Sequence, residues 1–430
     1  RSTLFPYTTL FRSLEVQLTA RNRGTENEAP MCGVPHHAIE SYIAKLLDAG
    51  LRVAICDQVE DPKEAKGLVK REVTRVVTPG TVSDPELLEG KRANLLAAIT
   101  WERGGEGRGG AAFLDVSTGS FFVRRFRSAE EGIEDLALFA PREVLFEAGS
   151  LPVELAEFAE REAACRTWLA EEHRFDSRRA SDLLLRHFGA STLRGFGLED
   201  GEPAVRAAAS ALAYAQSTQR NELAHIRGLS LREPGDRLIL DATTLANLEV
   251  FKNQRGAAAG GKGRKGTLLA VLDKTATAPG GRLLADWLAR PLADPDAIGD
   301  RHAAVGELAG DHARRDRLRE QLARVGDPER LLSRAVLGTM SPREAAALRD
   351  GLAAAATALS GLAEATLAGL AAPLLARLAA TDPLVDLAAD LEATLAAAPA
   401  TSPADGAVIA EGIDADLDRF RSLARNSKQI

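Results

Sequence analysis

The stretch from Met31 to Asp84 constrains the fold most, because a helix pattern and two strand patterns alternate within it. Apolar residues in 38–49 recur at the spacing of one helix face, and Gly50 follows them where a helix can end in the left-handed conformation. Two short apolar runs, 53–56 and 73–78, have the length and composition of strands. The stretch therefore predicts a small mixed α/β module in which a loop joins two strands.

The loop between the two predicted strands is rich in positive charge. Five lysines and arginines accompany two glutamates between positions 63 and 75. The basic residues are Lys63, Lys66, Lys70, Arg71 and Arg75. Phosphate contacts in protein–DNA complexes come largely from lysine and arginine side chains. Composition alone leaves two interpretations open, a DNA-contacting loop and a solvated surface loop, and the second is the more common.

Two further regions follow the module at 14–88. Residues 94–218 alternate strand-like and helix-like segments, which predicts an α/β domain, and residues 225–430 are mostly helix-like. The predicted strands are 95–101, 111–116, 120–126 and 144–146, and the predicted helices of the same region are 129–138, 153–161, 177–188 and 203–217. The glycine-rich segment 104–110 is predicted to link the first two strands.

Capping residues mark several helix starts in the last region. Asp294, Asp327 and Asp382 each precede a proline, which predicts an N-cap followed by proline at the first helical position. Ser341 and Glu344 have the spacing of a capping box. These signals predict where individual helices begin.

Composition limits the class of protein. The 430 residues are 45% hydrophobic and 27% charged, which is ordinary for a soluble globular chain of several domains. The net charge of −7 means that any nucleic-acid contact depends on local basic patches. Three widely spaced cysteines, Cys32, Cys56 and Cys165, favour a reducing cytosol over a disulfide framework or a metal site. No apolar run is long enough to predict a membrane span, for which about 18 residues are needed.

Residues 1–13 do not share the patterns that follow. They show no periodic apolar face, and they lack the apolar centre and cleavage site of a signal peptide. The segment resembles a translated sequencing adapter. We expect residues 1–13 to be non-native and to contribute nothing to the fold.

Three phrases in the first module carry a resemblance to a known family. They are GVPHHAIESYIAKL, VAICDQVEDP and RVVTPGT. In this order they resemble the mismatch-recognition module of the bacterial MutS family of DNA mismatch repair proteins. Later phrases, LDATTLANLEVF and GTLLAVLDKTATAPGGRLLADWLARPL, resemble the family's helical core or lever domain. The resemblance runs from Leu14 to about Ala424 and implies a multidomain α/β plus α protein, with a ribonuclease H-like connector at 94–218.

The resemblance also implies a function. Members of the family bind and bend duplex DNA at mispaired or unpaired bases, act as homodimers with MutL as a partner, use ATP and magnesium, and work in the cytoplasm. By match to the family, Met31 lies near the mispair and Arg71 contacts the DNA backbone. The DNA-binding candidates are Met31, Lys66, Lys70, Arg71 and Arg75.

We expect the chain to be incomplete at both ends. The family's Phe-x-Glu wedge phrase and its ATP-binding P-loop are not found in it. No residue of the chain is therefore assigned to catalysis, nucleotide binding or metal binding. The run from Gly256 to Gly263 fits the P-loop spacing around Lys262, but Gly263 replaces the required serine or threonine and a predicted helix precedes it. A surface loop is the favoured interpretation.

Two other motifs have competing interpretations. His36 and His37 suggest a metal, but no third ligand stands near, so a turn is favoured. Asp115 occupies the place of the first metal carboxylate in a ribonuclease H-like nuclease. The acidic residues that could join it at a metal site are Asp135, Glu143 and Glu147, but their spacing in the sequence is not typical of such a site. A turn-forming aspartate is favoured. A nuclease, or a MutS-family protein of another DNA transaction, remains the alternative function.

Overall fold

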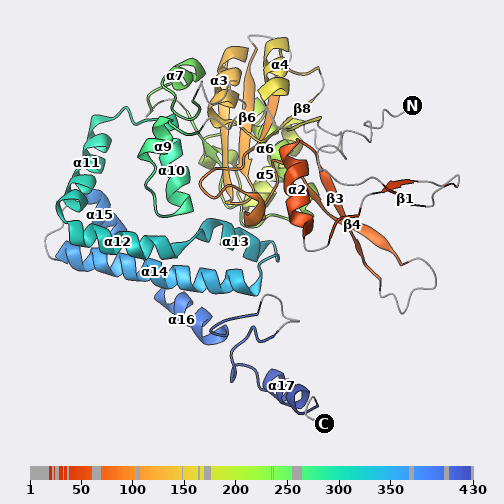
Figure 1. Ribbon diagram of the computed structural model, residues 1–430. Coiled ribbons are helices and arrows are strands. Elements are labelled where there is room, and N and C mark those ends of the chain that lie inside the picture. The colour runs from red at the N-terminus through yellow and green to blue at the C-terminus, as the bar shows by residue number, and fades with distance from the viewer. Residues whose placement is uncertain are drawn as a thin grey trace. The chain divides into compact units, whose positions relative to one another are not determined.

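The computed structural model describes most of the chain (Figure 1). The described residues are 19–21, 24, 29–31, 33–35, 38–60, 69–102, 107–147, 149–162, 165–168, 176–233, 235, 237–253, 264–367, 372–400 and 406–427. The chain divides into two compact units: unit 1 comprises 1–89 and 93–233, and unit 2 comprises 90–92 and 234–430. Unit 1 is mixed α/β and unit 2 is built of helices, so the predicted fold class is confirmed.

The first module of unit 1 has the predicted helix and strand pair. Its elements are β1 (Thr19–Arg21), β2 (Ala29–Met31), α2 (Ile39–Asp48), β3 (Val53–Gln58), β4 (Arg71–Val77) and the short 3-10 helix η2 (Pro85–Leu87). Ile43 and Leu47 of α2 are buried in one cluster with Val77 and Val82. Gly50 follows the helix at a φ of 75°, the left-handed conformation that favours glycine. The local signals in the sequence therefore placed this helix and its end correctly.

The rest of unit 1 is built on a six-stranded sheet of order β10-β7-β6-β5-β8-β9. Its strands are β5 (Leu96–Trp101), β6 (Gly109–Asp115), β7 (Ser120–Phe126), β8 (Glu143–Phe146), β9 (Cys165–Trp168) and β10 (Ser230–Leu231). Strands β5, β6 and β7 are antiparallel, whereas β8 runs parallel to β5 and β9 runs parallel to β8. This is the ribonuclease H-like arrangement that the resemblance implied. Strands β9 and β10 were not predicted, because such short segments carry no readable alternation.

Helices cover both faces of this sheet. They are α3 (Ala129–Phe139), α4 (Val153–Glu162), α5 (Ser177–Phe188), the 3-10 helix η4 (Leu193–Phe196) and α6 (Pro203–Gln219). On one face, Leu136 of α3 and Leu155 of α4 pack with Phe113 and Phe126 of the strands. Helix α6 packs against β5, β6 and β7, and most of its residues are buried. Small alanine side chains let this helix approach the strands closely.

Gly110 shows how close the approach is, and it corrects one prediction. A Cβ added at Gly110 would lie 2.3 Å from the backbone nitrogen of Ala204 at the start of α6. The glycine-rich segment 104–110 was predicted to be a link, but Gly109 and Gly110 lie inside β6. They are glycines because other groups occupy the space of their side chains, and not because the backbone has to turn there.

His225 of unit 1 is a partly buried titratable side chain. His225 Nε2 lies 2.8 Å from the carbonyl oxygen of Val116, so Nε2 carries the proton and donates it. The Nδ1 atom is buried and has no hydrogen-bond partner among the described residues. Burial lowers the pKa of His225, and nearby His187 acts in the same direction, while the Val116 carbonyl and Asp115 oppose them.

We therefore expect unit 1 to lose stability as the pH falls below about 6.5, the ordinary histidine value. Below that pH the unfolded chain binds a proton at position 225 before the folded chain does, and the loss stops once the folded histidine is also charged. The measurement is urea unfolding at pH 7.5 and pH 5.5. The variant His225→Gln keeps a donor for Val116 but does not titrate, so its unfolding should depend less on pH. An identical pH dependence in both proteins would contradict the assignment.

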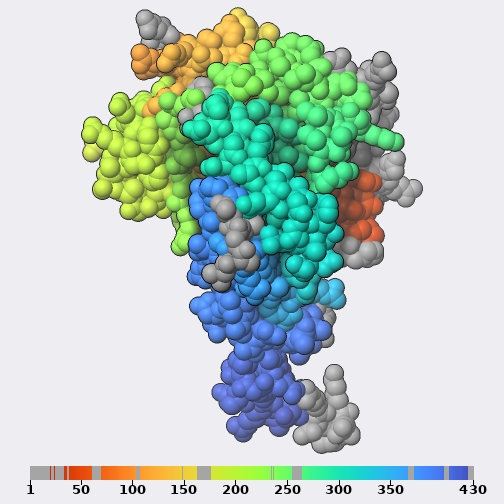
Figure 2. Space-filling model, turned by 90° about the vertical axis from the view of Figure 1, so that its left-hand side faces the viewer, coloured from red at the N-terminus to blue at the C-terminus, as the bar shows by residue number. Residues whose placement is uncertain are grey.

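The described secondary-structure elements of unit 2 are helices. They are α7 (Ala242–Asn247), α9 (Leu268–Leu272), α10 (Ala278–Ala289), α11 (Pro295–Gly310), α12 (His312–Val325), α13 (Pro328–Val336), α14 (Pro342–Leu367), α15 (Pro373–Ala379), α16 (Val385–Thr394) and α17 (Ala415–Ser427). Helices α12 and α14 lie side by side, and a Cβ added at Gly351 would lie 2.4 Å from the carbonyl oxygen of Val325 (Figure 1). In Figure 2, teal atoms of this unit lie next to blue ones. None of the helices in the described ranges is long and apolar enough to cross a membrane.

Most of the predicted helix starts in unit 2 are confirmed. Asp294 and Asp327 cap α11 and α13, and Ser341 and Glu344 exchange the two hydrogen bonds of a capping box. The prediction for Asp382 was wrong. Its carboxylate accepts from the amide of Leu384, and the helix begins only at Val385, because Leu384 adopts a φ of 53° that interrupts the helical backbone.

Candidate nucleic-acid interface

The antiparallel pair β3–β4 contains an irregularity that sets the direction of its basic side chains. Ile55 pairs with Arg75 and Cys56 pairs with Val73, so Thr74 is an extra residue on β4. Its hydroxyl donates to the carboxylate of Asp57. An extra residue of this kind is a β-bulge, which shifts the alternation of side chains between the two faces of a strand.

The bulge separates two basic residues that alternation alone would place on one face. Arg75 shares a face with Val77 and Ile55, whereas Arg71 pairs with Gln58 beyond the bulge and lies on the opposite face. Arg71 begins β4, as its position before the predicted strand suggested, and its side chain is exposed. No ion pair involves Arg71 within the described ranges. Its guanidinium is thus available to an external anion.

Lys70 is exposed but already has a partner. Its Nζ lies 2.6 Å from a carboxylate oxygen of Glu72, and its backbone amide donates to the carboxylate of Glu60. The hydrogen bond and the charge of Glu72 raise the pKa of Lys70. Both side chains are largely exposed, so the pair contributes little to stability. A DNA phosphate would have to compete with Glu72 for this ammonium group.

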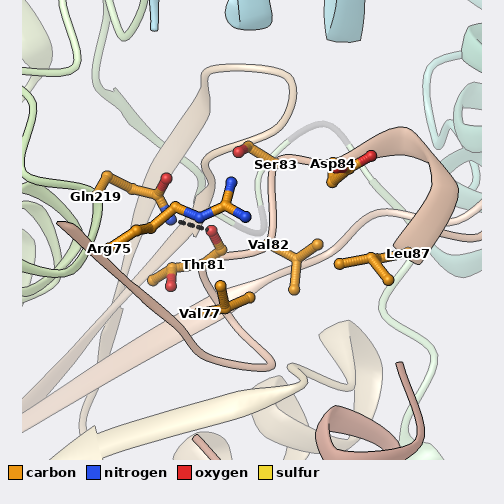
Figure 3. A pocket seen from close by; sticks show the side chains of 8 residues that line it. All are labelled: Arg75, Val77, Thr81, Val82, Ser83, Asp84, Leu87 and Gln219. Atoms are coloured by element: carbon orange, nitrogen blue, oxygen red, sulfur yellow. Dashed lines mark hydrogen bonds between the residues drawn. The ribbon is translucent and has the colours of Figure 1, made fainter. Parts of the chain in front are cut away.

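Arg75 extends into a small pocket instead of pointing to open solvent. Figure 3 shows its guanidinium passing Gln219 toward the segment 81–84. In the same pocket, Gln219 Nε2 donates to the carbonyl oxygen of Thr81 at 2.6 Å, which ties the end of α6 to the first module. Arg75 is half-buried there. Its position suits a role in packing more than a contact with a flexible polyanion.

The other two DNA-binding candidates are only partly covered by the structure. Met31 is the last residue of β2 and pairs with Thr19 of β1, but the placement of its side chain is outside the described residues. Lys66 and Lys63 lie in 61–68, also outside the described residues, as do His36, His37 and the Gly256–Gly263 run. The DNA-binding candidates whose side chains the structure describes are therefore Lys70, Arg71 and Arg75.

Asp115, the candidate nuclease carboxylate, is used to build a turn. One of its carboxylate oxygens accepts from the amide and hydroxyl of Ser117, and the other accepts from the amide of Asn94. Of its possible partners, Asp135 instead forms an ion pair with Arg124. Burial raises the pKa of the Asp135 carboxyl, and the Arg124 guanidinium offsets only part of this effect. Within the described ranges, no three histidine, cysteine or acidic side chains are grouped in a way that could hold a metal.

Comparison with known families decides between the alternatives. Models of three successive MutS domains match the chain: domain I over residues 8–86, domain II over 94–227 and domain III over 243–429. The chain belongs to the MutS family. The match to domain I begins at residue 8, within the segment 1–13 that we expected to be non-native. Domain II corresponds to the ribonuclease H-like sheet, and domain III lies within unit 2.

Curated MutS relatives align along nearly the whole chain. The chain is 40% identical to the DNA mismatch repair protein MutS of Symbiobacterium thermophilum over 97% of its own length and 47% of the relative's. It is 42% identical to that of Syntrophobacter fumaroxidans, over 96% of this chain and 45% of the relative. It is 40% identical to the DNA mismatch repair protein MutS of Myxococcus xanthus, over 97% of this chain and 46% of the relative. The chain thus spans about half the length of the curated relatives it matches.

Glu143, which sequence reasoning considered only as a metal ligand, instead joins MutS domains I and II. Its side chain is fully buried at the start of β8. One carboxyl oxygen accepts from the Thr78 hydroxyl and the Gly80 amide, and the other accepts from the Tyr214 hydroxyl of α6. The only signal in the sequence was an acidic residue at the edge of an apolar strand. Its partners could not be read from the sequence, because they lie 63 to 71 positions away.

Proposed function

We propose that this chain forms the DNA-recognition, connector and core domains of a MutS protein that acts in DNA mismatch repair. The observation that supports this proposal is the match to MutS domains I, II and III, in order, at about 40% identity to curated mismatch repair proteins. The whole protein would bind duplex DNA at mispaired or unpaired bases. The proposal extends to a homodimer, to MutL as a partner, to ATP and magnesium as cofactors of the whole protein, and to the cytoplasm.

The physical basis of recognition is the deformability of DNA. A mispaired or unpaired base stacks poorly, so the duplex kinks there at a lower cost in free energy than at paired bases. A protein that binds only kinked DNA therefore selects errors without reading the sequence. Contacts to phosphates hold the protein in register but carry no preference between bases. Domain I supplies such contacts through the basic side chains of the β3–β4 pair.

Arg71 is the phosphate contact that we propose from the described residues. Its side chain is exposed, it lies on the face of β4 opposite to Arg75, and its direction is held by the ladder with β3. Arg71→Ala should weaken binding to matched and mismatched duplexes by similar factors. It should also reduce the slope of log affinity against log salt by about one. At 0.1 M salt the loss corresponds to about eightfold in affinity, since each phosphate contact contributes a slope of about 0.9.

The measurement is fluorescence anisotropy with a matched duplex and with one carrying a single unpaired base, over a range of salt. Arg75→Ala is the matched control, because it removes the same charge from the same strand but from the half-buried side. Its salt slope should stay close to that of the unmodified chain. An Arg71→Ala protein with unchanged slope and affinity would remove Arg71 from the interface. A change in the ratio between the two duplexes would assign it to the mispair instead.

A further inference from the structure

The joint between MutS domains I and II is short: the match to domain I ends at 86 and the match to domain II begins at 94. Leu88 packs on the core of domain I. The backbone amide of Asn94 donates a hydrogen bond to the carboxylate of Asp115, and its side-chain amide donates one to the carbonyl oxygen of Pro79, both in unit 1. Between these two positions the chain changes unit. Glu89 and Ala93 belong to unit 1, but Gly90–Arg92 belong to unit 2. The three residues therefore have their contacts in the helical unit.

Each of the three residues is held by a different part of unit 2. Lys91 Nζ lies 3.0 and 3.1 Å from the two carboxylate oxygens of Asp273, after α9, and 3.0 Å from the carbonyl oxygen of Thr275. The guanidinium groups of two arginines donate hydrogen bonds to the backbone carbonyl oxygens of the residues before and after Lys91. Arg282 of α10 donates to Gly90 at 2.7 Å, and Arg330 of α13 donates to Arg92 at 2.8 Å.

The two arginines are themselves fixed in place. Arg282 makes a bidentate pair with Asp327 and also binds Glu329. Arg330 has a side chain that is 2% exposed, and it lies 3.8 Å from the same Asp327. Because these guanidinium groups are ordered by other contacts, they lose little further freedom when they bind the carbonyl oxygens of the joint.

Gly281 provides the surface on which Lys91 lies. A Cβ added at this position would come within 2.6 to 2.7 Å of the Cβ, Cγ and Cδ atoms of Lys91. Gly281 lies within α10 and does not have a positive φ, so a helix former would otherwise be favoured at this position. The glycine leaves room for the stem of the lysine, whose ammonium group then reaches Asp273.

We propose that Gly90–Arg92 is a strap by which the helical unit holds the joint between domains I and II. The contact that fixes the strap is Lys91, whose stem packs on Gly281 and whose ammonium group binds Asp273. Only two residue steps separate the strap from Leu88 on one side and from Asn94 on the other. Two steps span at most about 7 Å in a fully extended chain. A displacement of the strap anchors by more than this distance has to move Leu88 or Asn94 as well. The strap thus transmits movement of α10 and α13 to Leu88, before it in the chain, and to Asn94, after it.

Limited digestion with trypsin tests the strap, because cleavage after Arg92 requires this segment to open locally. Gly281→Ala displaces the Lys91 stem without changing charge. Lys91→Met keeps the stem and removes the charge, and Asp273→Asn keeps an oxygen acceptor for Thr275. We expect each variant to be cleaved after Arg92 about tenfold faster than the unmodified chain, which corresponds to a local opening that is tenfold more populated.

Gly299→Ala in α11 is the matched control. It is the same substitution in the next helix along the chain, and among the described residues no atom beyond its own helix backbone and chain neighbours lies within 4 Å of the added Cβ. It should leave cleavage after Arg92 unchanged. Cleavage after arginines of α12, followed in the same digests by mass spectrometry, reports general unfolding. An increase confined to Arg92 supports the strap. The proposal is overturned if the three variants are cleaved there no faster than Gly299→Ala, or if cleavage rises equally throughout α12.

Discussion

Glu143→Ala is expected to lower the free energy of unfolding of unit 1 by about 3–5 kcal/mol. The substitution removes the acceptor of three buried donors, the Thr78 hydroxyl, the Gly80 amide and the Tyr214 hydroxyl. A buried donor left without an acceptor costs about 1–3 kcal/mol. Thr78 also lies within hydrogen-bonding distance of the Thr81 hydroxyl, which limits the total. The effect reaches both domains of unit 1, because Thr78 belongs to domain I and Tyr214 to domain II.

The measurement is urea unfolding followed by circular dichroism, with the free energy extrapolated to water. Tyr214→Phe is the matched control, because it removes one donor and leaves the carboxyl group with its other two. It should cost about 1 kcal/mol. If Glu143→Ala cost no more than Tyr214→Phe, the carboxyl group would not join the two domains energetically, and the three hydrogen bonds would be incidental to stability.

Gly110→Ala is expected to destabilise unit 1 by about 3 kcal/mol, which is a large effect for one added methyl group. The added Cβ would lie 2.3 Å from the nitrogen of Ala204 and 2.5 Å from its Cα. These are backbone atoms of α6, so the helix has to move as a body or the strand has to bend. Overpacking against backbone is costlier than overpacking against the free end of a side chain.

Gly195→Ala is the control for this prediction. Gly195 lies in η4 of the same unit, and the described part of the chain places no atom within 4 Å of the added Cβ apart from the local backbone and chain neighbours. Its effect should stay within about 0.5 kcal/mol. Both variants are compared with the unmodified chain in the same urea titrations. A Gly110→Ala protein as stable as Gly195→Ala would show that α6 lies further from β6 than the structure places it.

The basic residues of domain I show where sequence reasoning reached its limit. The predicted strand 73–78 left Arg71 just before its first residue, whereas in the structure Arg71 is the first residue of β4. Strict alternation would then place positions 71, 73 and 75 on one face. The extra residue Thr74 breaks this alternation and puts Arg71 and Arg75 on opposite faces. A bulge depends on how the partner strand pairs, and no spacing within β4 reveals it.

Features that depend on residues a few positions apart were determined by the sequence itself. The apolar stripe of α2, the left-handed Gly50 after it, and the capping box of Ser341 and Glu344 all arise from contacts within one or two turns of the chain. The phrases that identify the MutS family are equally local. Each of these signals can be read without knowing which distant segment will pack against it, because backbone propensity and periodicity act over short separations.

Only the tertiary structure decided the features whose partners are far apart in the chain. Glu143 meets Tyr214 across 71 positions, Lys91 meets Asp273 across 182, and Gly110 lies under the first turn of a helix that begins at Pro203. In the sequence the three residues look like a metal-ligand candidate, a surface lysine and part of a glycine-rich loop. Their roles follow from which groups surround them after folding, and local pattern does not encode contacts between segments that meet only in the packed core.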